Sequence, residues 1–172
     1  MGEIIRFAWA TSSFGDFIAA VSGEGIVALE FSAHRAAMEE TLRARFPGAE
    51  VVDGQADLAG LLPRFVGAIE QPGADPGLPL DLRGTSYEVA VWTMLRSIPA
   101  GETVHYGALA ARLETRDARG VTEAIANNAI AVLVPCHRVI KKDGSISGYR
   151  WGVKRKRALL SREQGPGNFR LA

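Results

Sequence analysis

Residues 133–152, LVPCHRVIKKDGSISGYRWG, contain the only cysteine of the chain, Cys136. Pro135 precedes it, and because proline cannot donate to a strand ladder, we expect the chain to turn at the thiol. His137 follows directly, with Arg138 and Lys141 close behind. A positive field lowers the pKa of a thiol and favours the nucleophilic thiolate. The stretch therefore predicts a reactive cysteine in a basic setting.

A buried, inert cysteine is the main alternative, since free cysteine is among the residue types most often found inside proteins. Neighbouring residues of an extended chain point to opposite faces, so His137 would reach the sulfur only through a turn or a bridging water. A histidine that acts as a base also needs a third group to fix its tautomer. Glu163 is a candidate because it is the only carboxylate of the last predicted helix, although the sequence alone does not select it.

The composition indicates one globular domain or two small ones. The chain has 172 residues, of which 47% are hydrophobic and 23% are charged. It has neither an apolar run long enough to cross a membrane nor a secretion signal, so we expect a cytoplasmic protein with no membrane partner. One cysteine excludes an internal disulfide and any zinc site built from several cysteines. The three histidines show no metal-ligand spacing, so we expect no metal, and dinucleotide-binding and phosphate-loop motifs are missing, which agrees with the absence of a cofactor that a family resemblance described below implies.

The charges are distributed unequally along the chain. Residues 1–82 hold 5 basic and 12 acidic side chains, and residues 83–172 hold 15 basic and 7 acidic ones. A basic half suggests that this part of the chain binds a polyanion such as nucleic acid. Two solvated surfaces of different composition would give the same counts, so the asymmetry is suggestive only.

The first half predicts an α+β domain. Three runs rich in Ile, Val, Phe and Ala, IIRFAWAT, GDFIAAVS and GIVALEFS, are separated by Gly and Ser and predict a three-stranded antiparallel sheet. Helices are expected over residues 34–46 and 57–70, the second disturbed at Pro63. Residues 71–84 are dense in Pro and Gly, as in a linker. We therefore expect a structural N-terminal domain over residues 1–82 and a second domain over residues 83–172.

The second half predicts a mostly helical domain. Thr85 and Glu88 have the spacing of a capping box at the start of a helix that ends near Pro99. A short helix over 106–113 and another that begins at Asp117 fit a helix-turn-helix, although the turn between them lacks glycine. The run AVLVP at 131–135 is β-like, residues 139–147 predict a hairpin that turns at Asp143–Gly144, and a helix closes the chain. This order suggests a winged-helix arrangement.

PCHRVI followed by GSISGYRWG resembles the active-site signature of the O6-alkylguanine-DNA alkyltransferases, also called methylated-DNA–protein-cysteine methyltransferases. The likeness extends back through LRGTSYEVAVWTMLRSIPAGETVHYGALA and covers residues 82–164. In residues 1–81 only the layout is similar, most of all to the repair portion of bacterial adaptive-response proteins, whose zinc-cysteine module this chain lacks. The resemblance implies binding to double-stranded DNA and flipping of the damaged base into a pocket.

The chemistry that the resemblance implies is DNA repair by direct reversal. The Cys136 thiolate would take the alkyl group, mainly methyl, from O6-alkylguanine and also from O4-alkylthymine. His137 would accept the thiol proton through a water, Glu163 would orient His137, and Tyr106 would donate a proton to the leaving guanine. Asn128 would support the active-site segment. The thioether product has no carbonyl for water to attack, so each chain would act once, and a monomer is expected.

The remaining residues that the resemblance assigns fall into two groups. In the helix that begins at Asp117, Arg119 would fill the gap left by the flipped base in the minor groove. The predicted DNA contacts are Arg119, Gly120, Val121, Thr122, Glu123 and Arg138. Glu123 departs from the small residues that the family favours, which puts DNA affinity in doubt. The predicted substrate pocket comprises Val134, Pro135, Ser147, Tyr149, Arg150 and Trp151, and the bulk of Trp151 would restrict large alkyl groups.

Three other functions compete with repair. An alkyltransferase-like protein that flags lesions without reacting would lack Cys136. A transcriptional regulator would use the helix-turn-helix alone, or as part of a longer adaptive-response activator. A cysteine hydrolase would need a histidine that reaches the sulfur and a releasable acyl product, and PCHRV carries no known protease or elbow signature.

Overall fold

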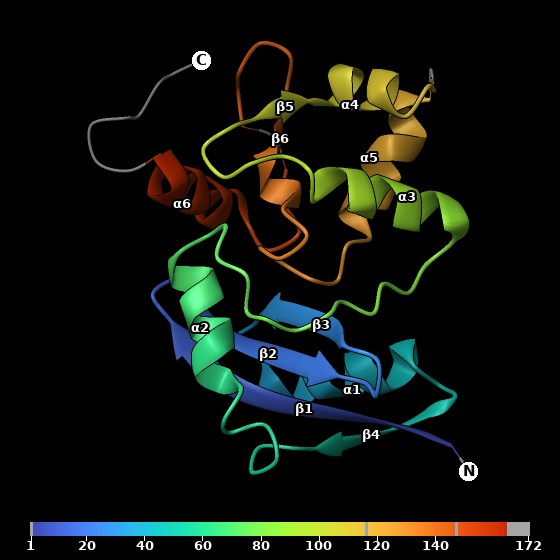
Figure 1. The fold of residues 1–172 in the computed structure, drawn as a ribbon, viewed down its shortest axis with the longest axis vertical. Coiled ribbons are helices and arrows are strands. Elements are labelled where there is room, and N and C mark those ends of the chain that lie inside the picture. Colours follow the sequence, from blue (N-terminus) through green and yellow to red (C-terminus); the bar gives the residue numbers. More distant parts are fainter. Residues whose placement is uncertain (1, 116, 147, 165–172) are drawn as a thin grey trace.

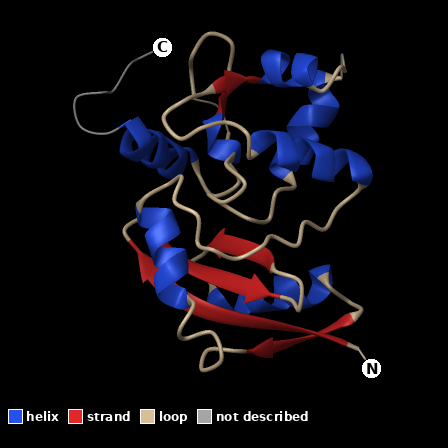
Figure 2. Cartoon of the chain, in the orientation of Figure 1, coloured by secondary structure: helices blue, strands red, loops and turns tan. Residues whose placement is uncertain are grey.

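The fold is described from a computed structural model that covers residues 2–115, 117–146 and 148–164. It is an α+β structure in which an N-terminal sheet with two helices lies beneath a helical C-terminal half (Figure 1, Figure 2). The strands of the first half are β1 (Glu3–Ser12), β2 (Gly15–Val21), β3 (Ile26–Phe31) and β4 (Ala49–Asp53). Its helices are α1 (Arg35–Arg45) and α2 (Leu62–Glu70), so the disturbance expected at Pro63 is the start of a helix, where proline is tolerated.

The N-terminal sheet has four strands in the order β3-β2-β1-β4, so the prediction of three strands was wrong. The first three form the expected antiparallel meander, and β4 pairs with β1 in parallel after the crossover through α1. Strand β4 has five residues, of which only Val51 is buried. Such a short segment with one apolar contact gives little periodic signal, and the pairing with β1 is what makes it a strand.

The two faces of the sheet bury different cores. Successive residues of β2 alternate between them: Phe17 and Ala19 belong to one cluster, Ile18 and Ala20 to the other. The cluster that contains Ile18 packs against Leu42 and Phe46 at the end of α1. The cluster that contains Phe17 includes side chains of α2 and of the C-terminal half. The sheet is therefore covered on both sides, which explains why every residue of β3 is buried.

The elements of the second half are α3 (Ser86–Leu95), β5 (Val104–His105), α4 (Tyr106–Arg112), α5 (Ala118–Ala126), a 3₁₀ turn (Cys136–Arg138), β6 (Val139–Ile140) and α6 (Val153–Gln164). The capping box is present: the Glu88 amide donates to Thr85 Oγ1 at 3.1 Å, and the Glu88 side chain accepts from the Thr85 amide at 3.0 Å. Asp117 caps α5 as predicted by accepting from the Gly120 amide. The helices α4 and α5 thus begin where the sequence placed them.

Two extended segments predicted in this half do not form. Strand β6 has two residues and pairs in parallel with β5, so the paired strands of the hairpin expected over 139–147 do not form in the described part of that segment. The predicted turn at Asp143–Gly144 does form: the Gly144 amide donates to the Lys141 carbonyl at 2.9 Å, and the Lys141 amide donates to the Ser145 carbonyl at 3.1 Å. The run AVLVP is a buried turn. Ile130, which directly precedes it, forms an isolated β-bridge with Leu29 of β3. The backbone on either side of Ile130 donates one hydrogen bond to Leu29 and accepts another from it. These two hydrogen bonds cover the open edge of the sheet. Tertiary contact with the sheet replaces the local strand that its composition favours.

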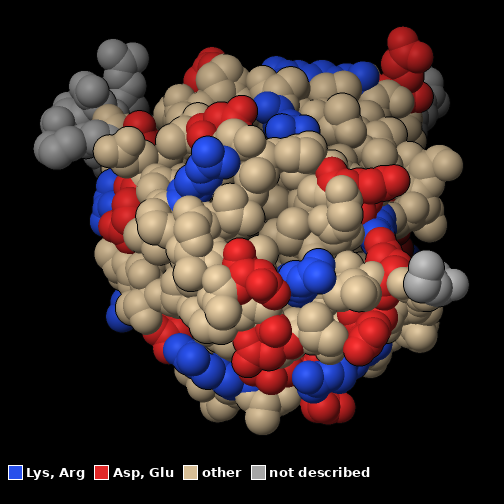
Figure 3. Space-filling model, turned by 60° about the horizontal axis from the view of Figure 1, so that its bottom comes forward, with Lys and Arg blue, Asp and Glu red and all other residues tan. Residues whose placement is uncertain are grey.

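One core cluster joins the two halves of the chain. It contains Leu29 of β3, Phe65 of α2, Trp92 of α3 and Leu159 of α6 together with Cys136. Acidic and basic side chains are interspersed on the side where the N-terminal sheet lies (Figure 3). The excess of acidic residues in the first half therefore makes no single field on that face. Within the described residues, no helix has the length and apolar character needed to cross a membrane.

Candidate active site

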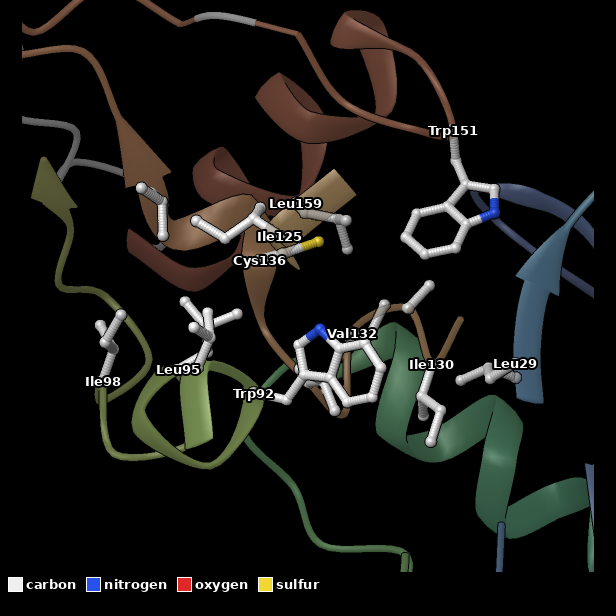
Figure 4. Packing of buried hydrophobic residues seen from close by; sticks show 14 of the residues in the cluster. Leu29, Trp92, Leu95, Ile98, Ile125, Ile130, Val132, Cys136, Trp151 and Leu159 are labelled. Carbon is white, nitrogen blue, oxygen red and sulfur yellow. The ribbon is translucent and has the colours of Figure 1, made fainter. Parts of the chain in front are cut away.

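The single thiol lies at a turn, as the preceding proline suggested. Pro135 ends the buried segment, and Cys136 opens a 3₁₀ turn that also holds His137 and Arg138. The residue Cys136 is only 4% exposed, and its sulfur lies among apolar side chains that include Ile125 and Leu159 (Figure 4). It also lines a cavity of about 560 Å³ that opens toward α4 and α5. The thiol is therefore buried on the protein side and accessible from the cavity.

Asn128 connects the thiol to the segment that leads into it. The side chain is buried, and its Nδ2 donates to the carbonyl of Val134 at 3.0 Å and lies 3.3 Å from Cys136 Sγ. Its Oδ1 accepts from the amide of Ile130 at 2.9 Å. One amide group thus fixes both ends of the turn between α5 and the thiol. Asn127 is the C-cap of α5, and the backbone amide of Asn128 donates to the carbonyl of Ile125 at 3.2 Å, so the side chain of Asn128 is left for the thiol segment.

The electrostatic setting of the thiol differs from the prediction. Burial raises the pKa of Cys136 to about 11, and the opposing effects of Asn128, Lys156 and Arg150 are smaller. The cations that favour the thiolate are Lys156 and Arg150 rather than the basic residues next to it in the sequence: Arg138 is engaged with Glu163, and Lys141 lines the cavity. At neutral pH the resting thiol is therefore protonated, and a base must remove its proton before it can act as a nucleophile.

Lys156 is the cation that sequence reasoning missed. It is 1% exposed, in the first half of α6, and its Nζ lies 3.5 Å from the carbonyl oxygen of Gly148. Burial lowers the pKa of its ammonium to about 8, and the charge of Cys136 opposes that shift. In the sequence Lys156 is one of four consecutive basic residues, 154–157, at the start of the last predicted helix, where cations oppose the helix dipole. Only the docking of α6 against the thiol turn shows that one member of the cluster points inward.

His137 and Glu163 form a buried pair, as the sequence suggested. Nε2 of His137 hydrogen-bonds to Oε1 of Glu163, and both side chains are fully buried. Burial lowers the pKa of His137, and Glu163 opposes this only in part. Burial raises the pKa of Glu163, but the hydrogen bonds from His137 and Arg138 outweigh it and hold the value below the ordinary one. A neutral imidazole whose Nε2–H donates to this carboxylate has its lone pair on Nδ1.

Arg138 does not face DNA, so this part of the prediction was wrong. The residue is 5% exposed, its Nε and Nη2 donate to both oxygens of Glu163 at 2.9–3.1 Å, and its Nη1 donates to the carbonyl of Ile98 at 2.6 Å. An arginine two residues after the thiol turns inward because the 3₁₀ turn directs it toward α6. Its function is to neutralise the carboxylate that orients His137.

The cavity next to the thiol is built from four segments. Its lining residues are Tyr106, Thr122, Ile125, Ala126, Cys136, Lys141, Gly148, Tyr149 and Arg150. Tyr106, Tyr149 and Arg150 were predicted for this site. Val134 is fully buried, Pro135 lines a different cavity, and Trp151 lies with Phe14 at a third cavity, so none of these three lines the wall above the thiol. Trp151 therefore does not restrict the size of a group in this cavity. Ser147, also predicted, lies outside the described residues.

Comparison with known proteins places the chain among alkyltransferases. Residues 86–165 match the family model described as 6-O-methylguanine DNA methyltransferase, DNA binding domain. The inducible methylated-DNA–protein-cysteine methyltransferase of Bacillus subtilis is 36% identical over 126 residues, which are 73% of this chain and 70% of that protein. The crystal structure of Mycobacterium tuberculosis OGT in complex with DNA superposes with a TM-score of 0.72 at 31% identity, over 95% of this chain and 96% of that one.

The chain belongs to the O6-methylguanine-DNA methyltransferase family. The bifunctional transcriptional activator/DNA repair enzyme Ada of Escherichia coli is 38% identical over 160 residues, 92% of this chain. The chain spans 45% of the length of that relative.

In this family member, helix α5 presents only part of the predicted contact set. Arg119, Thr122 and Glu123 are exposed, whereas Val121 is fully buried against the core and cannot touch DNA. Successive helical residues are 100° apart, so an apolar residue between exposed ones belongs to the inner face. A Cβ at Gly120 would overlap the Asp117 carboxylate, so glycine there permits the N-cap. Thr122 also lines the cavity and thus joins the α5 surface to the thiol site.

The site shows no arrangement for a metal ion. Across residues 2–115, 117–146 and 148–164, no three His, Cys, Asp or Glu side chains are grouped as ligands. The sequence did not assign Ile125, Ala126 and Lys156 to the site, and packing of α5 and α6 brings them there. Helical spacing could have placed Ile125 on an inner face, but no local signal marks Lys156.

Proposed function

We propose that this chain repairs DNA by direct reversal and takes the alkyl group from O6-alkylguanine onto Cys136 in a single turnover. The observation that carries the proposal is the buried thiol at the wall of a cavity beside a neutral histidine whose Nε2 is held by a carboxylate. The thiolate sulfur forms a bond to the alkyl carbon as the carbon–oxygen bond to guanine breaks. The thioether resists hydrolysis, so the alkylated chain is the end product.

His137 serves as the base in this scheme. Its Nδ1 is buried and has no hydrogen-bond partner among the described residues, and a bridging water would connect it to the thiol. The lowered pKa keeps the imidazole neutral at pH 7, so it can accept the proton. After the transfer of the proton, the imidazolium is stabilised by Glu163, whose own charge is balanced by Arg138.

Tyr106 and the cavity walls handle the base. Tyr106 begins α4 and lines the cavity, so its hydroxyl can donate to a guanine placed there. Protonation of the leaving guanine avoids its departure as an anion. The apolar lining from Ile125 and Ala126 suits a flat aromatic ring, and Tyr149 adds a further wall. The cavity is large enough for a flipped nucleobase with its alkyl group, since the pockets that bind drug-sized ligands have volumes of about 300–1,000 Å³.

The helices α4 and α5 form the DNA-binding helix-turn-helix in this proposal, with α5 in the minor groove. Arg119 is exposed near the start of α5 and would enter the gap left by the flipped base. Residues 83–172 would act as the DNA-binding and catalytic domain and residues 1–82 as a structural one, in a monomer. The family match over residues 86–165 and the DNA complex of the related OGT support the assignment of DNA binding to the second half of the chain.

The test is intact-protein mass spectrometry after the chain is mixed with a duplex that carries one O6-methylguanine. We expect wild type to gain one methyl group, about 14 Da, at most once per chain, and Cys136→Ser to gain nothing. Binding to the lesion without a mass gain would instead support a protein that flags damage. Repeated turnover would exclude the single-use scheme.

A further inference from the structure

Glu30 is a buried carboxylate on β3, the edge strand of the sheet. It lies in β3, all six residues of which are buried, and its side chain is 3% exposed. A carboxylate in such a place is costly unless cations and hydrogen-bond donors surround it. Two arginines satisfy it: Arg45 Nη1 lies 2.7 Å from Oε2, and Arg150 Nη2 lies 3.3 Å from Oε1. Each oxygen therefore has its own guanidinium, from opposite ends of the chain.

The second arginine is part of the candidate active site. Arg150 lines the cavity above Cys136, and its Nη1 donates to the carbonyl oxygen of Asn128 at 3.0 Å. The side-chain amide of Asn128 is the group 3.3 Å from the thiol sulfur. One guanidinium thus joins the N-terminal sheet, the turn that carries the thiol and the cavity wall. Without Glu30, one hydrogen bond to a carbonyl and the Trp151 ring, whose centroid lies 5.7 Å from the guanidinium carbon, would hold a flexible side chain that is 32% exposed.

We propose that Glu30 is a positioning residue for alkyl transfer, which acts by holding Arg150 against the cavity wall beside Cys136. The inference rests on the proposed function, because its final readout is methyl transfer. The contact between Glu30 and Arg150 does not depend on that function. The thiol faces Asn128 and Arg150, Lys156 from α6, Tyr106 from α4, and Tyr149 and Lys141 of the cavity. Of these groups, Arg150 is the one that Glu30 of the N-terminal sheet contacts directly among the interactions described.

The expected effect is on the charge state of the thiol. The positive charge of Arg150 favours the thiolate, so its release raises the pKa of Cys136 above the resting value. Arg150 is the weakest of the named influences on that pKa, so for Glu30→Gln we expect a rise of about half a unit, which lowers the thiolate fraction, and with it the rate constant of methyl transfer at pH 7, about threefold. The pH profile of the reaction shifts to higher pH by the same amount.

The experiment measures single-turnover methyl transfer and the reaction of Cys136 with iodoacetamide, both from pH 6 to 9.5. Arg45→Met is the matched control, because it removes the other partner of Glu30 and does not line the cavity. We expect that control to lose stability and to keep the wild-type rate and pH profile. Arg150→Met should reproduce the effect of Glu30→Gln, and the double variant should be no slower than Arg150→Met alone.

Three results would overturn the proposal: a wild-type pH profile in folded Glu30→Gln, a wild-type rate in Arg150→Met, or additive losses in the double variant. If Glu30→Gln does not fold, Arg150→Met still decides, because that side chain is one-third exposed and Glu30 keeps Arg45 as a partner. If wild type transfers no methyl group, the proposed function fails, and the iodoacetamide profile tests the role of Glu30 without DNA.

Discussion

At the scale of the residue, burial and charge compete around Cys136, and burial prevails in the resting protein. The pKa of the thiol is raised to about 11, although Asn128, Lys156 and Arg150 all favour the thiolate. His137 is kept neutral by its own burial and is therefore able to accept a proton. The site holds its nucleophile protonated and its base unprotonated, so the thiolate forms only as the proton moves.

Lys156→Met should raise the pKa of Cys136, because it removes the nearest buried cation and replaces it with an apolar chain of similar length. The pKa of Lys156 is about 8, so its charge is present at pH 7 and lost above that value. Wild type should react faster with iodoacetamide than Lys156→Met at pH 6.5–7.5, and the two rates should converge near pH 9.5. Lys154→Met on the exposed face is the control; an equal effect there would argue against a specific role of Lys156.

Arg138→Met should lower the free energy of unfolding by about 3–5 kcal/mol, because it removes the cationic partner of Glu163 and leaves that buried carboxylate with His137 and the Gly101 amide. Urea unfolding followed by circular dichroism measures the change. Lys142→Met, which removes an exposed cation from the same segment, should change it by no more than about 0.5 kcal/mol. Comparable losses in the two variants would mean that the inward network of Arg138 contributes little.

At the scale of the element, the turn between α4 and α5 carries an unfavourable backbone conformation. Glu114 follows the C-cap Leu113 and has φ of 55°, in the left-handed region that favours glycine. The amides of Glu114 and Thr115 close the end of α4 by donating to Ala111 and Ala110. The turn therefore has the geometry of a glycine-capped helix end without the glycine. The lack of that glycine is one reason why a helix-turn-helix was only weakly predicted from the sequence.

Glu114→Gly should stabilise the protein by about 0.5–1 kcal/mol, since glycine adopts this conformation without strain. The thermal unfolding midpoint should rise accordingly. Glu114→Ala removes the same side chain without relieving the backbone and should give no such gain. If both variants gain equally, loss of the carboxylate rather than the backbone conformation is the cause.

At the scale of the whole molecule, the shared core couples the stability of the fold to the protonation of the site. Burial lowers the folded-state pKa of His137 below its value in the unfolded chain. The unfolded state then binds more protons below the unfolded value of about 6.5, so folding weakens as the pH falls through that range. Glu163, whose pKa is also lowered, adds a loss at lower pH.

The free energy of unfolding should therefore fall between pH 7 and pH 5 in wild type, measured by urea titration at each pH. His137→Gln should be less stable at pH 7 but should show a flatter dependence over this range. His34→Gln, which alters an exposed imidazole, should keep the wild-type slope. A wild-type slope in His137→Gln would assign the pH dependence to other groups.

Interactions between residues close together in the sequence determined where the reactive turn lies and where several helices begin. The proline before the thiol, the capping box at Thr85 and the cap at Asp117 act through neighbours within a few residues, so the sequence located the reactive turn and the starts of α3 and α5. The pairing of His137 with Glu163 was also anticipated, although the alternatives remained open until α6 was placed. Strand β4, with one buried residue, left too little pattern to recognise.

Only the tertiary structure decided which charges serve the site. Arg138 points inward and donates to Glu163, and Lys156 is buried close enough to the thiol to affect its charge. Glu30 of the sheet pairs with Arg150, which is far from it in the sequence. Trp151 and Val121 pack in the core instead of facing substrate or DNA. Burial and pairing of charges depend on contacts between segments far apart in the chain, and the energy of a buried charge is set by those contacts, which no local pattern of residues contains.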